Sequence, residues 1–391
     1  MKYRHVFLLS SANQHGYLFV DSLLNKYGVN REEIALFFYD NKSREGLIFP
    51  NTLLDLRIYF MSDPHAPEVI RDADTVTINS LQPENAKVAV DLQKSGYLAY
   101  EKLYIRITDD EVDRWNKNYQ DNGVLTESAE SLIDENVLEV LSIVKNFICL
   151  DRPWGRLLKS VTGRKLNIIS AVPFAHVIPD QASYEFFDEI VRKSIVRQMT
   201  NESIVRVLFF TKSKPIRDSI VILKQLIKEL LFMKRQFRKK SIEFLVWKKS
   251  RIKNPLLCLL EFLCLILARL KGIKISFIEV SSLPKESYLL MLYRCHYLIF
   301  QKRGGLGAAN EFLRHGGQVL VNSKSLNFEV FDNFPGLQVV SINNDFKYFD
   351  HLMDDRVNDV AQYFDKNRAS AKLAFDKAKS EYHKAYNEIY G

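Results

Sequence analysis

The chain has 391 residues, of which 47% are hydrophobic and 26% charged, and its formal net charge is +8 at pH 7. This composition excludes a disordered or low-complexity chain, and the length fits two domains that each bury a core. The four cysteines, Cys149, Cys258, Cys264 and Cys295, lie in apolar runs without the spacing of a zinc site or a disulfide framework. We therefore expect four core thiols in a reducing, cytoplasmic compartment and no export signal.

The first half of the chain alternates between strand-like and helix-like segments. Strands are predicted over residues 4–11, 33–40, 74–80 and 102–110, and helices over 17–28, 83–96 and 134–147. Residues 150–180 are rich in turn formers and predict an irregular connection. This order indicates a parallel, Rossmann-like N-terminal domain over residues 1–180, with the boundary falling between 173 and 202.

The second half repeats the alternation. A strand, a loop and a helix are predicted over 204–231, strands over 241–247, 273–280, 296–302, 318–323 and 337–343, and helices over 254–272, 283–294, 305–317 and 325–334. The pattern indicates a second Rossmann-like domain over residues 181–365. An exposed amphipathic helix pair is expected over 354–390, of which residues 366–391 form a separate C-terminal helix. The predicted fold class is α/β, with two Rossmann-like domains that face each other across a cleft.

A basic segment precedes the most apolar helix. Residues 234–253 contain nine Lys or Arg and a single acid, Glu243, which leaves a solvated face and an anionic partner both open. The helix over 254–272 carries Glu261 and Arg269 and is too short to span a bilayer, so a buried core helix is expected. A membrane-lying helix is the alternative, because each cation near an anionic surface adds about 1 kcal/mol to binding. Peripheral contact with the inner face of the cytoplasmic membrane therefore stays open.

A glycine-rich turn with two cations separates a predicted strand from a predicted helix. Lys302, Arg303, Gly304, Gly305 and Gly307 place backbone N–H groups, a helix N-terminus and two positive charges together. This combination favours binding of a phosphate or diphosphate over a turn that needs glycine for packing alone. The patterns GxxxxGK[ST] and GxGxxG are absent, so ATP hydrolysis and dinucleotide redox chemistry are not indicated.

Residues 281–331 resemble a known transferase family. The family shows a helix, a strand ending in Arg, a glycine turn, a second helix, a G-x-x-x-V-L-N motif and a following aromatic residue. The matching positions in this chain are Arg303, Gly305, Leu306, Gly307, Gly317, Asn322 and Phe328. The segment is similar to the C-terminal donor half of the bacterial transferase that adds 4-acetamido-4,6-dideoxygalactose (Fuc4NAc) to the lipid-linked intermediate of enterobacterial common antigen.

The resemblance implies a GT-B fold and a metal-independent glycosyltransferase of the hexosyltransferase type. It places the nucleotide sugar on the C-terminal domain and the acceptor on the N-terminal domain, and it implies no metal bound through an Asp-x-Asp motif. The expected acceptor is a lipid-linked oligosaccharide or a growing bacterial surface polysaccharide of the O-antigen, capsule or common-antigen type. No cofactor is expected besides the nucleotide sugar, which is a substrate.

The donor-side prediction rests on groups that stabilise a leaving nucleoside diphosphate. Cations and helix N-termini must neutralise its charge where no metal is bound. Glu311, in the helix after the glycine turn, is a candidate to accept hydrogen bonds from a ribose, and an exposed helix glutamate is the alternative. The predicted donor-binding residues are Thr211, Lys212, Ser213, Lys302, Arg303, Gly304, Gly305, Gly307, Glu311 and Asn322.

The acceptor hydroxyl needs a general base if the reaction inverts configuration. His15 follows the first predicted strand, and Asp109 and Asp110 follow a later strand of the same domain. The alternatives are a surface histidine and an ordinary helix N-terminus, where acids complement the helix dipole. His176 and Asp180 are weaker candidates, and the sequence does not decide between inversion and retention.

Two other functions stay open at this point. A nucleotide-sugar-modifying enzyme, such as a non-hydrolysing epimerase, has the same two-domain shape. A nucleic-acid-binding protein could use the basic segment 234–253, with Phe237, Phe244 and Trp247 as stacking residues. No nucleic-acid-binding motif is present, so no nucleic-acid partner is expected.

Overall fold

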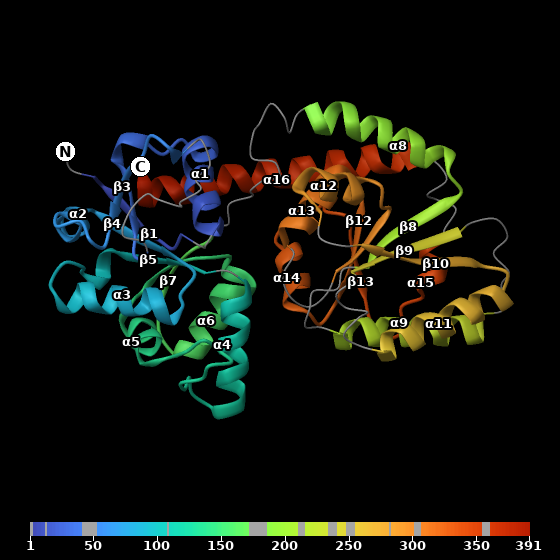
Figure 1. The fold of residues 1–391 in the computed structure, drawn as a ribbon, viewed down its shortest axis with the longest axis horizontal. Coiled ribbons are helices and arrows are strands. Elements are labelled where there is room, and N and C mark those ends of the chain that lie inside the picture. Colours follow the sequence, from blue (N-terminus) through green and yellow to red (C-terminus); the bar gives the residue numbers. More distant parts are fainter. Residues whose placement is uncertain are drawn as a thin grey trace. The chain divides into compact units, whose positions relative to one another are not determined.

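The structure is a computed structural model, and it divides the chain into two compact units (Figure 1). One unit contains Met1–Ala175 and Ala378–Gly391, and the other contains His176–Lys377. The predicted first domain instead ends at residue 180, and residues 366–391 are predicted to form a separate helix. The structure describes residues 3–11, 14–40, 53–107, 109–171, 186–209, 216–233, 241–247, 255–280, 283–300, 306–353 and 360–391.

The N-terminal unit is built on a parallel sheet with the strand order β3-β2-β1-β4-β5-β6-β7. Every residue of β1, β2 and β4 is buried, as expected for parallel strands covered by helices on both faces. The strands are β1 (His5–Leu9), β2 (Ile34–Phe38), β3 (Arg57–Phe60), β4 (Thr75–Asn79), β5 (Leu103–Arg106), β6 (Asn146–Ile148) and β7 (Asn167–Ile169). The helices are α1 (Gln14–Tyr27), α2 (Ala66–Asp72), α3 (Pro83–Lys94), α4 (Asp109–Asn122), α5 (Glu135–Ile143) and α6 (Arg156–Thr162).

Three predicted segments of this unit differ in the structure, and β3 and α2 lie where no element is predicted. The helix predicted over 134–147 ends at Ile143, because Val144 is extended and the next residues form β6. The region predicted to be irregular, 150–180, contains α6 and β7. The strand predicted over 102–110 ends at Arg106, and Asp109 begins α4. Strands of three residues are too short to show an apolar period, which is why β6 and β7 were missed.

The C-terminal unit contains a second parallel sheet, with the strand order β10-β9-β8-β11-β12-β13. All six strands fall on segments predicted as strands. They are β8 (Ile204–Phe209), β9 (Ser241–Trp247), β10 (Lys274–Val280), β11 (Tyr297–Phe300), β12 (Gln318–Asn322) and β13 (Val339–Ile342). The helices are α8 (Arg192–Asn201), α9 (Ile216–Phe232), α11 (Pro255–Leu270), α12 (Lys285–Tyr293), α13 (Leu306–His315), α14 (Leu326–Asp332), α15 (Tyr348–Leu352) and α16 (Val360–Tyr390).

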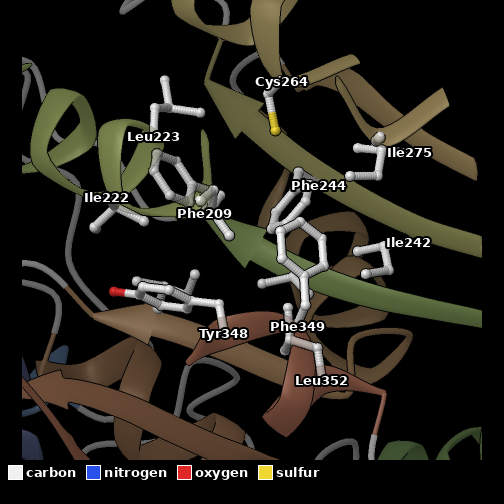
Figure 2. Packing of buried hydrophobic residues seen from close by; sticks show 14 of the residues in the cluster. Phe209, Ile222, Leu223, Ile242, Phe244, Cys264, Ile275, Tyr348, Phe349 and Leu352 are labelled. Carbon is white, nitrogen blue, oxygen red and sulfur yellow. The ribbon is translucent and has the colours of Figure 1, made fainter. Parts of the chain in front are cut away.

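An aromatic cluster fills the space between this sheet and helices α9, α11 and α15 (Figure 2). The rings of Phe209 and Phe244 meet edge to face at 6.4 Å between centroids, and Phe244 stacks on Phe277 at 5.2 Å. Such ring pairs add about 1 kcal/mol each beyond the area that they bury. The cluster fixes β8 against β9, and therefore fixes the strand that leads into one of the predicted phosphate-binding segments.

Helix α11 is only half a core helix. Leu257, Leu260, Cys264 and Ala268 face the interior, whereas Cys258 lies on the outer side and is exposed. The expectation of four core thiols is therefore wrong for Cys258. Because residues 254–272 are apolar on all sides, a buried core helix is predicted there. In the structure, only one side of α11 packs on the sheet.

The C-terminal region forms one continuous helix, α16, instead of the predicted exposed pair. Its last turns belong to the N-terminal unit, where Tyr382, Tyr386 and Tyr390 are buried. The hydroxyl oxygen of Tyr390 lies 2.8 Å from Oγ1 of Thr77 on β4, and the ring of Tyr386 lies 4.7 Å from that of Tyr27. Tyrosines four residues apart lie on one face of a helix, so this face of α16 is buried in the N-terminal unit.

Candidate functional site

The C-terminal sheet has a topological switch point between β8 and β11. The chain leaves β8 toward β9 and β10 on one side, then continues through β11, β12 and β13 on the other side. In open parallel sheets, ligands bind at the carboxyl ends of the strands at such a point. Ile299 of β11 pairs with Phe209 of β8. The segments 210–215 and 301–305 therefore start from neighbouring strand ends.

The predicted phosphate-binding residues fall mainly within those two segments. Thr211, Lys212 and Ser213 follow β8, and residues 302–305, which include Lys302, Arg303, Gly304 and Gly305, follow β11. All of them lie outside the described residues, so their role stays a prediction. The described flanks show that each segment runs from a strand end into a helix, α9 in one case and α13 in the other.

Gly307, in the first turn of α13, is described, and neither its backbone conformation nor its packing against the described residues requires a glycine there. Among the described residues, a Cβ atom at this position would meet no atom within 4 Å, and φ is not in the left-handed region. A helix with glycine at an interior position is less stable than the same helix with alanine by about 1 kcal/mol. The open space at Gly307 therefore leaves room for a ligand to approach the helix N-terminus closely.

Gly317, which belongs to the same resemblance, has a packing role instead. A Cβ atom built there would lie 2.3 Å from the ring of Phe312. The absence of a side chain lets the strand β12 begin directly beneath this ring. The two glycines of one predicted motif therefore serve different purposes.

Glu311 lies in the second turn of α13 and is fully buried. Its Oε1 atom is 3.2 Å from Nη1 of Arg314, and the guanidinium of Arg314 stands 5.0 Å above the ring of Phe375 on α16. These contacts engage the carboxylate in the packing of α13 on α16, which is a structural role. The prediction that Glu311 accepts a hydrogen bond from a ribose remains a prediction. The alternative, an exposed helix glutamate, is wrong, because the side chain is buried.

Asn322 ends β12, the strand next to β11. Its Oδ1 atom accepts a hydrogen bond from the backbone N–H of Lys324 at 2.9 Å, and its carbonyl accepts one from the hydroxyl of Ser325 at 2.7 Å. Ser325 in turn caps α14 by accepting from the N–H of Phe328. Asn322 therefore shapes the turn at the same carboxyl edge, and its contact with a donor stays a prediction.

The N-terminal sheet has its own switch point, between β1 and β4, which pair in parallel. His15, the predicted base, lies in the first turn of α1 just after β1, and its side chain is exposed. Asp109 and Asp110 open α4 after β5, and their side chains lie outside the described residues. His176 and Asp180 also lie outside the described residues. All three predicted bases follow strands at the carboxyl edge, and which of them acts stays open.

A polar network that the sequence analysis missed joins the ends of β1 and β2. Oδ2 of Asp40 accepts a hydrogen bond from the hydroxyl of Ser10 at 2.6 Å, and Oδ1 accepts one from the N–H of Ser11 at 2.9 Å. Burial and the charge of Asp40 raise the pKa of the neighbouring Tyr39 to about 12, so this phenol stays protonated at neutral pH. These hydrogen bonds connect the residues that follow β1 and β2, and they leave a carboxylate and several hydroxyls at this edge.

A second missed pair lies at the ends of β4 and β5. Arg106 donates a hydrogen bond to Oδ1 of Asn79, and its guanidinium stands 4.9 Å from the centroid of the Phe19 ring. The Nδ2 atom of Asn79 is buried and has no hydrogen-bond partner among the described residues. The next residue, Ser80, has a φ of 70°, which is uncommon outside glycine. A cation, an amide donor and a strained turn together suit binding of a polar or anionic ligand.

Within the part of the chain that the structure describes, no group of three or more His, Cys, Asp or Glu side chains is placed to hold a metal ion. Independence from a metal stays a prediction.

No protein-family model and no curated protein sequence matches the chain. Solved structures do match over nearly the full length. Sucrose-phosphate synthase from Thermosynechococcus elongatus has a TM-score of 0.57 at 10% identity, covering 100% of this chain and 99% of that one. Anabaena HepE, solved in complex with UDP and glucose, has a TM-score of 0.57 at 8% identity and covers 99% of both chains. A glycosyltransferase from Rickettsia africae has a TM-score of 0.55 at 12% identity, covering 100% of this chain and 98% of that one.

These likenesses show the fold. The two Rossmann-like units, each with a parallel sheet, correspond to the GT-B fold along the whole chain. The fold class predicted from the sequence is confirmed. At these identities the chemistry must be argued from the strand ends of this chain.

Proposed function

We propose that the protein is a glycosyltransferase that moves a sugar from a nucleotide-sugar donor to a lipid-linked or growing bacterial surface polysaccharide. One observation carries this proposal. The predicted phosphate-binding segments follow two paired strands, β8 and β11, at the switch point of the C-terminal sheet. The second segment leads into α13, where no described residue excludes a side chain at Gly307.

The structural neighbours support a nucleotide sugar as the donor. Anabaena HepE was solved with UDP and with UDP-glucose, and a UDP-forming trehalose-phosphate synthase from Burkholderia xenovorans was solved with glucose-6-phosphate. A uridine nucleotide is therefore the first donor class to test for this chain.

In the proposed reaction, negative charge develops on the leaving diphosphate. Lys302 and Arg303 would donate charge-assisted hydrogen bonds to it, with Lys212 from the neighbouring segment, and the N-terminus of α13 at Gly307 would add backbone N–H groups. These groups together supply the positive potential that a metal supplies in other transferases. No metal and no further cofactor are part of the proposal.

The acceptor belongs to the N-terminal unit in this proposal. His15, Asp109 or Asp110 would take the proton of the attacking hydroxyl if the reaction inverts. Arg106 and the Nδ2 atom of Asn79, which has no hydrogen-bond partner among the described residues, would orient the acceptor. The lipid-linked or polysaccharide acceptor follows from the resemblance of residues 281–331 to the Fuc4NAc transferase family, and it would bring the enzyme to the inner face of the cytoplasmic membrane.

A thermal-shift screen tests the donor. The purified protein is heated with UDP, TDP, GDP and CMP and their sugar conjugates, with EDTA and again with Mg²⁺. A ligand at 100 times its Kd stabilises the folded state by about 2.7 kcal/mol, which raises the Tm by several degrees. We expect one base to be selected, with the shift kept in EDTA and lost in Arg303→Ala.

Arg294→Ala is the matched control, because Arg294 is an exposed arginine that caps α12 in the same unit. It should leave the shift unchanged. Product analysis with the selected nucleotide sugar then distinguishes sugar transfer from epimerisation of the donor. A folded sample that no nucleotide stabilises would contradict the proposal.

A further inference from the structure

Helix α11 presents an apolar stripe to solvent. Leu256, Leu259, Phe262, Ile266 and Leu270 are between 42% and 76% exposed. Their spacing of three or four residues places them on one side, opposite the residues that pack on the sheet. A surface helix of a globular protein normally carries charged residues on its outer side. The outer side of α11 carries one charge, on Arg269.

Helix α9 extends this surface. It packs alongside α11 on the same face of the sheet (Figure 1). The Nζ atom of Lys271 donates a hydrogen bond to the carbonyl of Met233 at 3.0 Å, which joins the C-terminal ends of the two helices. Phe232 and Leu270, each 76% exposed, therefore lie at adjacent helix ends. We name this surface the α9–α11 face; it consists of Leu231, Phe232, Leu256, Leu259, Phe262, Leu263, Ile266 and Leu270.

On α9, on α11 and at the start of β10, the exposed charged side chains that the structure describes are all positive. Lys224 and Lys228 are exposed on α9, and Lys274 is exposed where β10 begins. The described glutamates of the two helices do not oppose them, because Glu261 is buried and Oε1 of Glu229 accepts backbone N–H groups of α15.

We propose that the α9–α11 face docks on the surface of an anionic lipid bilayer. An apolar helix face flanked by cations is the pattern of helices that lie in the plane of the interface. The cations gain from the negative surface potential, while the apolar side chains enter the boundary of the acyl chains. A second copy of the chain would bring two positive faces together, which the charges oppose. Among the described helices, none is both long and apolar enough to cross a bilayer.

This inference does not depend on the donor chemistry. The α9–α11 face lies on one side of the C-terminal sheet, whereas the β8–β11 strand ends lie at the sheet's carboxyl edge. Docking through the face would therefore leave that edge uncovered. Membrane binding and nucleotide binding can be removed separately, so failure of one proposal does not imply failure of the other.

Vesicle flotation tests the proposal. The full chain is mixed with vesicles of phosphatidylcholine alone, or of phosphatidylcholine with phosphatidylglycerol, at low and high salt. We expect the wild type to float with the anionic vesicles and to be released at high salt. The triple variant Leu259→Gln, Phe262→Gln and Ile266→Gln keeps good helix formers and should bind at least about tenfold more weakly, because three apolar side chains no longer enter the interface.

The control is Leu373→Gln, which changes a 74% exposed leucine on α16 of the same unit. It should bind like the wild type, and circular dichroism should show the same helix content in all three proteins. The proposal is overturned if the wild type stays in the unfloated fraction or if the triple variant floats as well as the wild type. Sedimentation velocity showing a wild-type dimer that the triple variant loses, without vesicle binding, would assign the face to a second copy instead.

Discussion

The two units place different chemistry at equivalent positions of the same kind of sheet. At the carboxyl edge beside the β1–β4 switch point lie the hydroxyl of Ser10, the carboxylate of Asp40 and the hydrogen-bonded pair Asn79–Arg106. At the β8–β11 switch point, the strand ends lead into segments rich in Lys, Arg and Gly. The fold supplies two equivalent edges, and the residues at the strand ends decide which ligand each edge can take.

The largest expected effect distinguishes Gly317, which directly precedes β12, from Gly307 in α13. Gly317→Ala should lower the free energy of unfolding by about 3 kcal/mol, because its Cβ atom would overlap the Phe312 ring. Gly307→Ala should stabilise the protein by about 0.5–1 kcal/mol, since the space is open and alanine favours a helix. Urea unfolding measures both changes. Equal losses in the two variants would show that Gly307 is also a packing glycine.

The second prediction compares an arginine at each edge. Arg303→Ala should weaken binding of a nucleoside diphosphate by on the order of 100-fold, because two charge-assisted hydrogen bonds are lost. Arg106→Ala should leave that affinity unchanged and should instead raise the KM for the acceptor. Isothermal titration with the selected nucleotide measures the first effect. The division of roles fails if Arg106→Ala, and not Arg303→Ala, removes nucleotide binding.

The third prediction uses Glu229, a half-buried carboxyl of the C-terminal unit. Burial raises the pKa of Glu229 to about 7, against hydrogen bonds from the N–H groups of Phe349 and Asp350 that lower it. The folded state then holds a proton that the unfolded state releases above pH 4.5, so stability falls as pH rises from 4.5 to 7.

Glu229→Gln removes this loss while its side-chain oxygen still accepts from α15. Relative to the wild type, the variant should be about equally stable at pH 5 and more stable by about 2 kcal/mol at pH 8. Urea unfolding at the two pH values checks this. An advantage that is the same at both pH values would show that Glu229 does not titrate in this range.

The smallest expected effect is a pH dependence of stability in the N-terminal unit. Its sign is opposite to that of Glu229, because stability falls as the pH is lowered. Burial lowers the pKa of His5 to about 4, and its Nδ1 atom lies 3.0 Å from Oγ1 of Thr75. Below pH 6.5 the His5 ring is protonated in the unfolded state but stays neutral in the folded state. The contribution of this group to the free energy of unfolding is therefore fully present above pH 6.5 and is lost as pH falls toward 4. We expect a loss of about 1 kcal/mol from this group between pH 6.5 and 5.5. An NMR titration of the His5 ring with a midpoint near 6.5 would contradict this.

The sequence predicted what long apolar segments determine. Continuous buried runs such as β1 and β11 identify parallel strands, and their alternation with helices predicts two Rossmann-like domains. The strands β6 and β7 are too short for any period to show. The buried side of α16 was missed because its tyrosines are anchored by residues far away in the sequence, such as Thr77.

The candidate site was predictable only in part, for a related reason. A cation beside glycines marks residues 302–307 from local sequence alone. The pairing of Asn79 with Arg106 depends on β4 and β5 being neighbours, which a single sequence does not reveal. The same holds for the adjacency of β8 and β11, which relates Lys212 to Arg303 although about 90 residues separate them.

A crystal structure of the protein with the nucleoside diphosphate selected by thermal shift tests the central claim most directly. We predict that the diphosphate lies at the carboxyl ends of β8 and β11, with hydrogen bonds from Arg303 and from the N-terminus of α13. A diphosphate bound at the β1–β4 edge, or away from both edges, would contradict the assignment of the donor to the C-terminal unit.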